Sequence, residues 1–147
     1  MSELLQRGFI VTDGPYSFNE IISVASDYDH SFTVTPDAQI KRGQYIVQRV
    51  SMCGDCHTPK TDKGEYDMTA WLAGDVLDFK PSHPMPFAAV APQIAGLPTM
   101  PTDEMAIRFF ETGTNATGKL AMPPMPRFRF EHDDAVAVVA YLRSLKK

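Results

Sequence analysis

The sequence contains only two cysteines, Cys53 and Cys56, and this scarcity excludes several classes of protein. A secreted mini-protein held together by disulfides needs several bridges. A structural zinc site needs a second pair of ligands, and no other cysteine is present to supply one. Two cysteines at this close spacing therefore indicate either a redox pair or the attachment point of a prosthetic group.

Strong positive charge and long apolar runs are also missing. The formal net charge is -4 and no block of like charge stands out, so we expect no nucleic-acid partner. No apolar run approaches the roughly 18–20 residues that span a bilayer. The first residues lack the basic segment and apolar core of a secretory leader. We therefore expect contact with a membrane only through a partner protein or through an anchor that has been removed.

The length and composition predict one domain with a sizeable core. Hydrophobic residues make up 44% and charged residues 22% of 147 residues, an ordinary globular balance. Most of the twelve prolines fall between residues 81 and 126, which predicts a loop-rich stretch there. We assign residues 35–147 to this domain and residues 1–34 to an N-terminal extension.

Apolar spacing and capping residues predict three main helices. The first begins at a Thr35 cap and runs up to the cysteines. The second covers residues 103–112, between a Thr102 cap and a stop at Gly113. The third covers about residues 132–145, and a turn or two of helix is expected around residues 68–72. Strand alternation and internal repeats are not evident, so the fold class is all-α.

Residues 53–57 read Cys-Gly-Asp-Cys-His, which is the attachment sequence for c-type haem. On a turning backbone the two cysteines can bond the two vinyl groups on one side of a porphyrin. His57 is then placed beneath the iron as a ligand. A thioredoxin-like redox pair would need a strand-helix-strand context that is not evident here. The motif therefore predicts one haem c, attached covalently through Cys53 and Cys56.

The second iron ligand is expected to be a methionine, because cytochromes that carry electrons commonly pair histidine with a thioether. The chain has eight methionines. Two of them, Met122 and Met125, lie in the segment Ala-Met-Pro-Pro-Met-Pro, whose prolines stiffen the loop and remove backbone donors. Both remain candidates on this argument.

The order of these features resembles the class I cytochromes c over about residues 36–147. The resemblance implies an all-α cytochrome c fold, with three main helices around one covalently bound haem and long Pro-rich loops. It also implies that the first and last helices cross closely, with Gly43 and Tyr45 facing Tyr141 and Leu142. Four segments are most similar to the bacterial branch that includes cytochrome subunits of dehydrogenases: Cys56-His57-Thr58-Pro59, Leu72-Ala73-Gly74, Pro123-Pro124-Met125-Pro126 and Ala140-Tyr141-Leu142.

The same resemblance selects between the two methionines. In short bacterial members the ligand lies about six residues before the cap of the last helix. Met125 lies six residues before Glu131, whereas Met122 lies nine before it. The resemblance therefore favours His57 and Met125 as the iron ligands, with Met122 in reserve.

These features predict an electron carrier rather than an enzyme, with one electron passed between redox partners. A haem enzyme or gas sensor would need an open iron position and a distal acid or base, which is not identifiable. The alternative is a cytochrome subunit or domain permanently bound in a larger respiratory or dehydrogenase complex. Expected partners are a dehydrogenase, a quinol-oxidising complex or a terminal oxidase of a respiratory chain. We expect the periplasm or the extracytoplasmic membrane face, where haem is attached, and therefore that a leader or anchor has been removed.

Two further expectations concern the surroundings of the haem. The segment of residues 81–98, with the apolar residues 85–87, is expected to line the haem crevice. Residues 85–87 and 122–125 lie near the expected crevice and are expected to contribute to an apolar docking patch around the exposed haem edge. Trp71 is expected to be a core residue whose indole N–H donates to the backbone, or alternatively to a haem propionate.

Overall fold

The computed structural model describes residues 35–115 and 117–145. The chain divides into two units, Met1–Thr33 and Val34–Lys147, and the helices and strands named below belong to the second unit. The extension assigned to residues 1–34 lies outside the described residues, so the boundary at residue 35 stays a prediction. In the part described, no helix has the length and hydrophobicity to cross a membrane.

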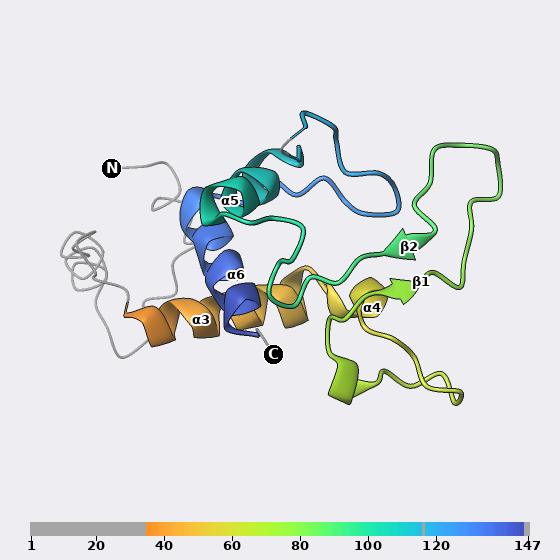
Figure 1. The fold of residues 1–147 in the computed structure, drawn as a ribbon, viewed down its shortest axis with the longest axis horizontal. Helices are drawn as coiled ribbons and strands as arrows, with labels where there is room; N and C mark the ends of the chain where they lie inside the picture. Colours follow the sequence, from red (N-terminus) through yellow and green to blue (C-terminus); the bar gives the residue numbers. More distant parts are fainter. Residues whose placement is uncertain (1–34, 116, 146–147) are drawn as a thin grey trace, which may run out of the picture. The chain divides into compact units, whose positions relative to one another are not determined.

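The three main helices are α3 (Pro36–Tyr45), α5 (Asp103–Thr112) and α6 (His132–Ser144) (Figure 1). The Thr35 side chain accepts a hydrogen bond from the backbone N–H of Ala38, and Thr102 caps α5 in the same way. Gly113 ends α5 with a φ of 66°, in the left-handed region that favours glycine. The predicted helices, their caps and the all-α class are confirmed.

Short elements connect the helices. A π-helical turn, η1 (Ile46–Val50), continues α3, and α4 (Gly54–His57) follows it closely. The predicted turn near residue 68 is the 3₁₀ helix η2 (Met68–Ala70). Strands β1 (Asp75–Val76) and β2 (Val90–Ala91) pair antiparallel, which the sequence did not predict because two-residue strands carry no readable alternation.

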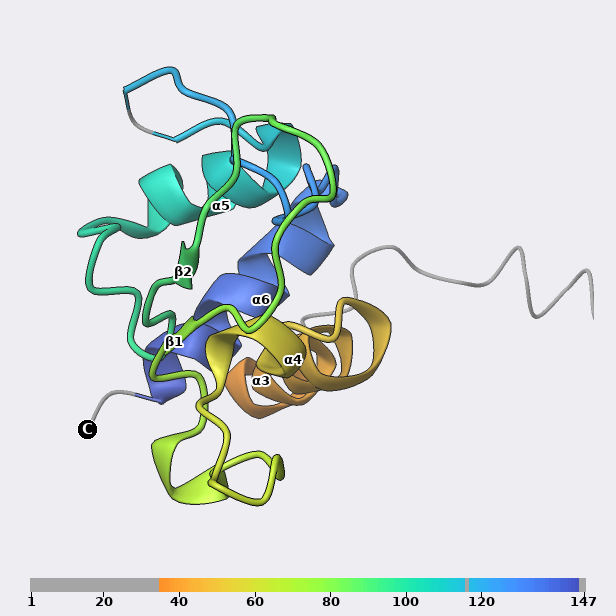
Figure 2. The ribbon, with the colours of Figure 1, turned by 90° about the vertical axis from the view of Figure 1, so that its right-hand side faces the viewer.

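The crossing of α3 and α6 forms the centre of the core (Figure 2). A β-carbon placed on Gly43 would lie 1.9 Å from the carbonyl oxygen of Ala137 and 2.9 Å from Cβ of Tyr141. The predicted approach of Gly43 to Tyr141 is therefore confirmed. Tyr45 is different: 62% of its surface is exposed and it lies outside the core. The buried residues of the core are Ile46, Val47, Leu72, Leu97, Ala106, Phe110, Ala135, Val138, Val139, Tyr141 and Leu142.

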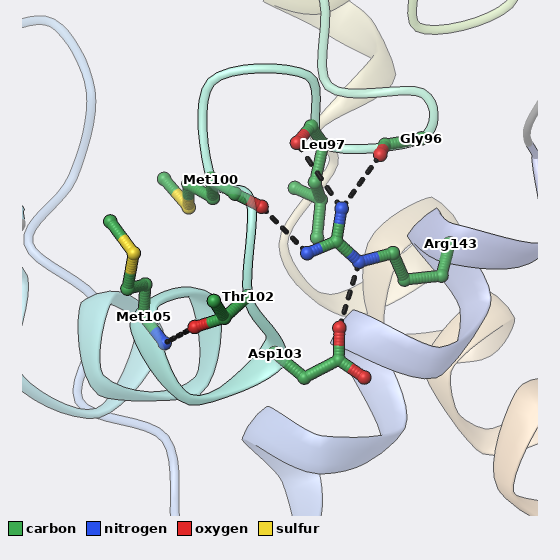
Figure 3. Close-up of polar contacts among 7 residues, drawn as sticks. All are labelled: Gly96, Leu97, Met100, Thr102, Asp103, Met105 and Arg143. Carbon is green, nitrogen blue, oxygen red and sulfur yellow. Dashed lines mark hydrogen bonds and ion pairs between the residues drawn. The ribbon is translucent and has the colours of Figure 1, made fainter.

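Arg143, near the end of α6, fastens the loop between β2 and α5 to the core (Figure 3). Its guanidinium group donates to the carbonyl oxygens of Gly96, Leu97 and Met100 at 2.9, 3.3 and 2.6 Å. It also pairs with the Asp103 carboxylate at 2.8 Å. Leu97 has a left-handed backbone, with a φ of 52°, and its side chain is almost fully buried. Arg143 therefore holds a strained stretch of backbone in place.

Candidate functional site

The predicted motif lies in and just before α4. Cys53 precedes the helix as its N-cap residue, and Cys56 and His57 lie in its last turn. Cys53 and Cys56 form no disulfide, and His57 is buried, with 5% of its surface exposed. A helix of four residues does not form by itself, so tertiary contacts must fix its position.

All three side chains line a cavity of about 240 Å³. Apolar side chains from distant parts of the sequence form most of its walls. They come from the segment around β1 and β2, from the loop before α5, from α5 itself and from the segment between α5 and α6, in which residues 121–126 form the methionine loop. They include Leu77, Ala91, Ile94, Leu97, Phe109, Phe110 and Phe128. The fold therefore brings the motif and the methionine loop to one apolar site.

The geometry of His57 suits a metal ligand. Its Nδ1 lies 2.7 Å from the carbonyl oxygen of Pro92. Because a carbonyl oxygen can only accept, Nδ1 carries the proton and Nε2 keeps its lone pair. Burial lowers the pKa of His57, which favours the neutral imidazole that a metal requires.

The chemistry of the cysteines argues against a redox-active dithiol. Burial raises the pKa of the Cys53 thiol to about 11 and also raises the pKa of Cys56. Redox-active dithiols have lowered pKa values, because the thiolate is the reactive form. Neutral thiols in an apolar cavity fit covalent attachment to an apolar ring. Among the described residues there is no group of three or more His, Cys, Asp or Glu that could hold a metal ion.

Both candidate methionines line this cavity. Met122 is 49% exposed and Met125 is partly buried. The backbone N–H of Met125 donates to the carbonyl of Met122 at 3.2 Å, and Ala88 donates to the carbonyl of Pro123 at 2.7 Å. The methionine loop is therefore tied both to itself and to the loop between β1 and β2.

Two other methionines, Met52 and Met100, also line the cavity, although the sequence reasoning gave them no role. A following proline could not have marked Met100, because Met85, Met122 and Met125 also precede a proline and Met85 does not line the cavity. Ser51 was missed as well. Ser51 lines the cavity, and its hydroxyl oxygen is buried without a hydrogen-bond partner. Among the described residues, no other side chain has a buried oxygen or nitrogen that lacks a partner. A bound group with a polar edge could supply that partner.

The expectation for residues 81–98 holds only in part. Ala88 and Val90–Ala91 line the cavity, but Met85, Pro86 and Phe87 are not among its lining residues. Pairing continues beyond the strands, since the N–H of Leu77 donates to the carbonyl of Ala89. Residues 78–88 therefore form the turn of a hairpin, where Met85 is 51% exposed and Phe87 packs edge-on against Phe79.

The expectation that Trp71 donates to the backbone is wrong. Its indole N–H donates to the side-chain hydroxyl of Tyr141, at 3.1 Å. The acceptor comes from a helix 70 residues away in sequence, which local pattern could not reveal.

A helical domain with a buried neutral histidine and two free thiols in one apolar cavity has the construction of a haem-binding electron carrier. The sequence matches the cytochrome c family over residues 40–146. The chain belongs to the cytochrome c family, which is defined by haem-based electron transfer. The residues in the cavity fit a haem: two thiols could attach it, one imidazole nitrogen could ligate its iron, and apolar walls would surround it.

Two relatives extend this result. The chain is 30% identical over 126 residues to a fructose dehydrogenase cytochrome subunit from Gluconobacter japonicus, an alignment that covers 80% of this chain and 24% of the relative. It is 47% identical over 34 residues to a diheme cytochrome c-type protein from Cereibacter sphaeroides, covering 23% of this chain and 12% of that protein. The chain thus aligns with about a quarter of the first relative and about an eighth of the second.

Proposed function

We propose that this domain carries one haem c, attached through Cys53 and Cys56 and ligated by His57 and Met125, and passes single electrons between redox partners. The observation that carries the proposal is the convergence in one apolar cavity of two free thiols, a buried histidine with Nε2 free, and the methionine loop. The count of one haem follows from the single attachment motif in the sequence.

Haem c, when bound, supplies a one-electron couple at its iron. The protein would set the reduction potential of that couple. The hydrogen bond to Pro92 orients the His57 ring and makes its free nitrogen a better donor. The apolar walls exclude water and disfavour the more highly charged oxidised iron, so burial raises the reduction potential. With two protein ligands on the iron, no position remains for a substrate.

Met125 is proposed as the second ligand because of its spacing from the last helix, and Met122 is the alternative because it lines the same cavity. Met125→Leu and Met122→Leu should be compared side by side in the haem-loaded protein. Leucine matches the volume of methionine but cannot coordinate iron. Loss of the ligand should remove the weak far-red sulfur-to-iron absorption of the oxidised form, lower the potential and admit carbon monoxide to the ferrous iron.

We expect Met125→Leu to show all three changes and Met122→Leu to keep the parent spectrum, at a packing cost below about 1.5 kcal/mol. A loss of the far-red band in Met122→Leu alone would assign the ligand to Met122. Retention of the band in both single variants calls for the Met122→Leu/Met125→Leu double variant, and a band that persists there would reject ligation by either residue, with Met100 tested next.

The second candidate function is that of a subunit or domain within a larger dehydrogenase or respiratory complex. Similarity to a dehydrogenase cytochrome subunit, and the small share of each relative that the chain covers, support it. The partner would be a dehydrogenase, a quinol-oxidising complex or a terminal oxidase. Gel filtration of the native source distinguishes the two functions: a free carrier elutes at the size of one chain, and a subunit elutes with its complex.

We place the protein in the periplasm or at the extracytoplasmic face of the membrane. The support is chemical, because haem attachment to a Cys-x-x-Cys-His motif takes place there in bacteria with this family of proteins. Fractionation of the native cell tests this placement, with covalent haem staining of the chain in the periplasmic and membrane fractions.

A further inference from the structure

The indole ring of Trp71 lies directly against the first residue of the attachment helix. A β-carbon placed on Gly54 would lie 2.4 Å from Cη2 and 2.6 Å from Cζ3 of the ring. Both distances are far shorter than an ordinary contact, so no side chain fits at position 54 while the ring keeps its place. Gly54 is the residue between the two cysteines that directly follows Cys53, and it is buried.

The ring is also held from its other side. Its N–H donates to the hydroxyl of Tyr141 at 3.1 Å, and that hydroxyl accepts a second hydrogen bond from the side-chain amide of Gln48 at 3.1 Å. Tyr141 lies in α6 and is buried, and Gln48 lies in η1. One hydroxyl therefore links Trp71 to α6 and to η1, and the indole cannot tilt away from Gly54 without breaking this link.

The backbone that follows Trp71 holds the other end of the same helix. The N–H of Leu72 donates to the Thr58 side chain at 3.2 Å, and the N–H of Gly74 donates to the carbonyl of His57 at 2.8 Å. Leu72 has a φ of 57°, a left-handed conformation that a leucine rarely adopts. This segment leads into β1, which lies beside α4 in both ribbon views (Figures 1 and 2). Contacts therefore fix α4 at its first and its last residue.

We propose that Trp71 is a positioning residue for the haem-attachment helix. The ring packs against Gly54 and is held in place by its hydrogen bond to Tyr141. It thereby sets the orientation of α4 and hence of His57 at the cavity. The glycine within the attachment motif is then required by the tryptophan and not by the haem chemistry. This proposal rests on the proposed function, in which His57 ligates the iron.

A double-mutant cycle tests the contact. Gly54→Ala, Trp71→Phe and the double variant should be produced as exported, haem-loaded protein, and the yield of attached haem and the reduction potential should be measured for each. Gly54→Ala should lower the yield and shift the potential, because the new methyl group collides with the indole. Phenylalanine lacks the outer ring atoms that collide, so the double variant should regain yield and return toward the potential of Trp71→Phe. Energetic coupling of this kind is expected between residues in contact, whereas the effects of distant, independent residues add.

A third variant tests the anchor without crowding the helix. Tyr141→Phe removes only the hydroxyl that accepts from Trp71 and Gln48, and it should shift the potential in the same direction as Trp71→Phe. Tyr45→Phe is the matched control, since Tyr45 is 62% exposed, and its potential should stay at the parent value. Gly64→Ala serves as the glycine control, because alanine there adds backbone strain at a φ of 80° but no collision, since nothing lies within 4 Å of the added β-carbon.

Each result bears on the proposal. A parent-like yield and potential in Gly54→Ala would overturn it, as would a double variant no better than Gly54→Ala. If Gly54→Ala yields no folded protein, recovery in the double variant supports the proposal and failure to recover rejects it. An unchanged potential in Tyr141→Phe would reject the anchor. Failure of the proposed function would be seen in a different experiment, because the parent chain itself would then carry no covalent haem ligated by His57.

Discussion

Replacement of Gly43 by alanine sets two opposing effects against each other. Alanine is the better helix former, and in a helix interior the exchange is worth about 1 kcal/mol in favour of folding. The new β-carbon, however, would lie 1.9 Å from the Ala137 carbonyl oxygen, whereas ordinary contact begins at 3.4 Å. Both atoms are fixed to helix backbones, so no side-chain rotation can relieve the overlap. Helices α3 and α6 would have to separate by about 1.5 Å, the difference of these two distances.

The clash outweighs the gain in helix propensity. A gap of 0.5–1 Å already costs about a quarter to a half of the dispersion energy of the atoms that face it. Overpacking of a core commonly costs about 1–3 kcal/mol, and a collision between two backbones belongs at or above the top of that range. After subtraction of the propensity gain we expect a net loss of about 2 kcal/mol or more in the free energy of unfolding. For a domain of this size that corresponds to a fall of about 8 °C in Tm.

The assay is thermal and denaturant unfolding of the haem-loaded protein, followed in parallel by far-ultraviolet circular dichroism and by haem absorption. Gly64→Ala is the matched control. Gly64 has a φ of 80° and open space around it, so alanine there costs only backbone strain, about 1 kcal/mol. A Gly43→Ala variant no less stable than Gly64→Ala would show that the helices do not cross as closely as described.

Four further outcomes are expected. Thr102→Ala should lower the free energy of unfolding by about 1 kcal/mol through loss of the α5 cap, while Thr102→Ser should retain most of it; equal losses in denaturant titrations would contradict the capping role. Arg143→Lys should destabilise the fold more than Asp103→Asn. Lysine cannot make the forked hydrogen bonds to three carbonyls, whereas the ion pair with the Asp103 carboxylate is weak because that side chain is 62% exposed. A lower Tm for Asp103→Asn than for Arg143→Lys would refute this. The net charge is only -4 and the predicted docking patch is apolar, so electron transfer to the native partner should depend weakly on ionic strength; a fall by orders of magnitude in stopped-flow rates would contradict the predicted patch. Expression of the chain without an export signal should yield colourless, poorly folded protein, and red haem-bound protein from the cytoplasm would contradict extracytoplasmic attachment.

Features encoded by neighbouring residues were predictable from the sequence. The Thr102 cap and the Gly113 stop bracket ten residues of helix, and both signals act within a few residues of the end that they define. The attachment motif is equally local, because five consecutive residues carry its chemistry. The choice between Met122 and Met125 is not local, since both lie in one short loop and both line the cavity.

The resemblance placed Tyr45 with Gly43 at the helix crossing, and helix geometry does not allow this. Residues two positions apart in an α-helix point about 200° apart, so Tyr45 faces away from α6 when Gly43 faces it, and Tyr45 is 62% exposed. Beyond Tyr45 the repeat changes, because Ile46–Val50 form a π-helical turn. Ile46 and Val47 in this turn are buried, whereas Val50 is 57% exposed. An apolar pattern read at 3.6 residues per turn cannot show such a change of repeat.

The hydrogen bond from His57 ends on a main-chain atom, and this limits how the protein can be altered by mutation. Every residue type carries a carbonyl oxygen, so no substitution at position 92 can delete the acceptor. A carbonyl also has no proton to gain or lose in the physiological range, so the strength of the bond does not follow pH as it would with a carboxylate partner. Only displacement of the backbone around Pro92 could weaken it. The histidine is thus insulated from single-residue change at its acceptor, and variation in redox behaviour among close variants should arise elsewhere in the cavity wall.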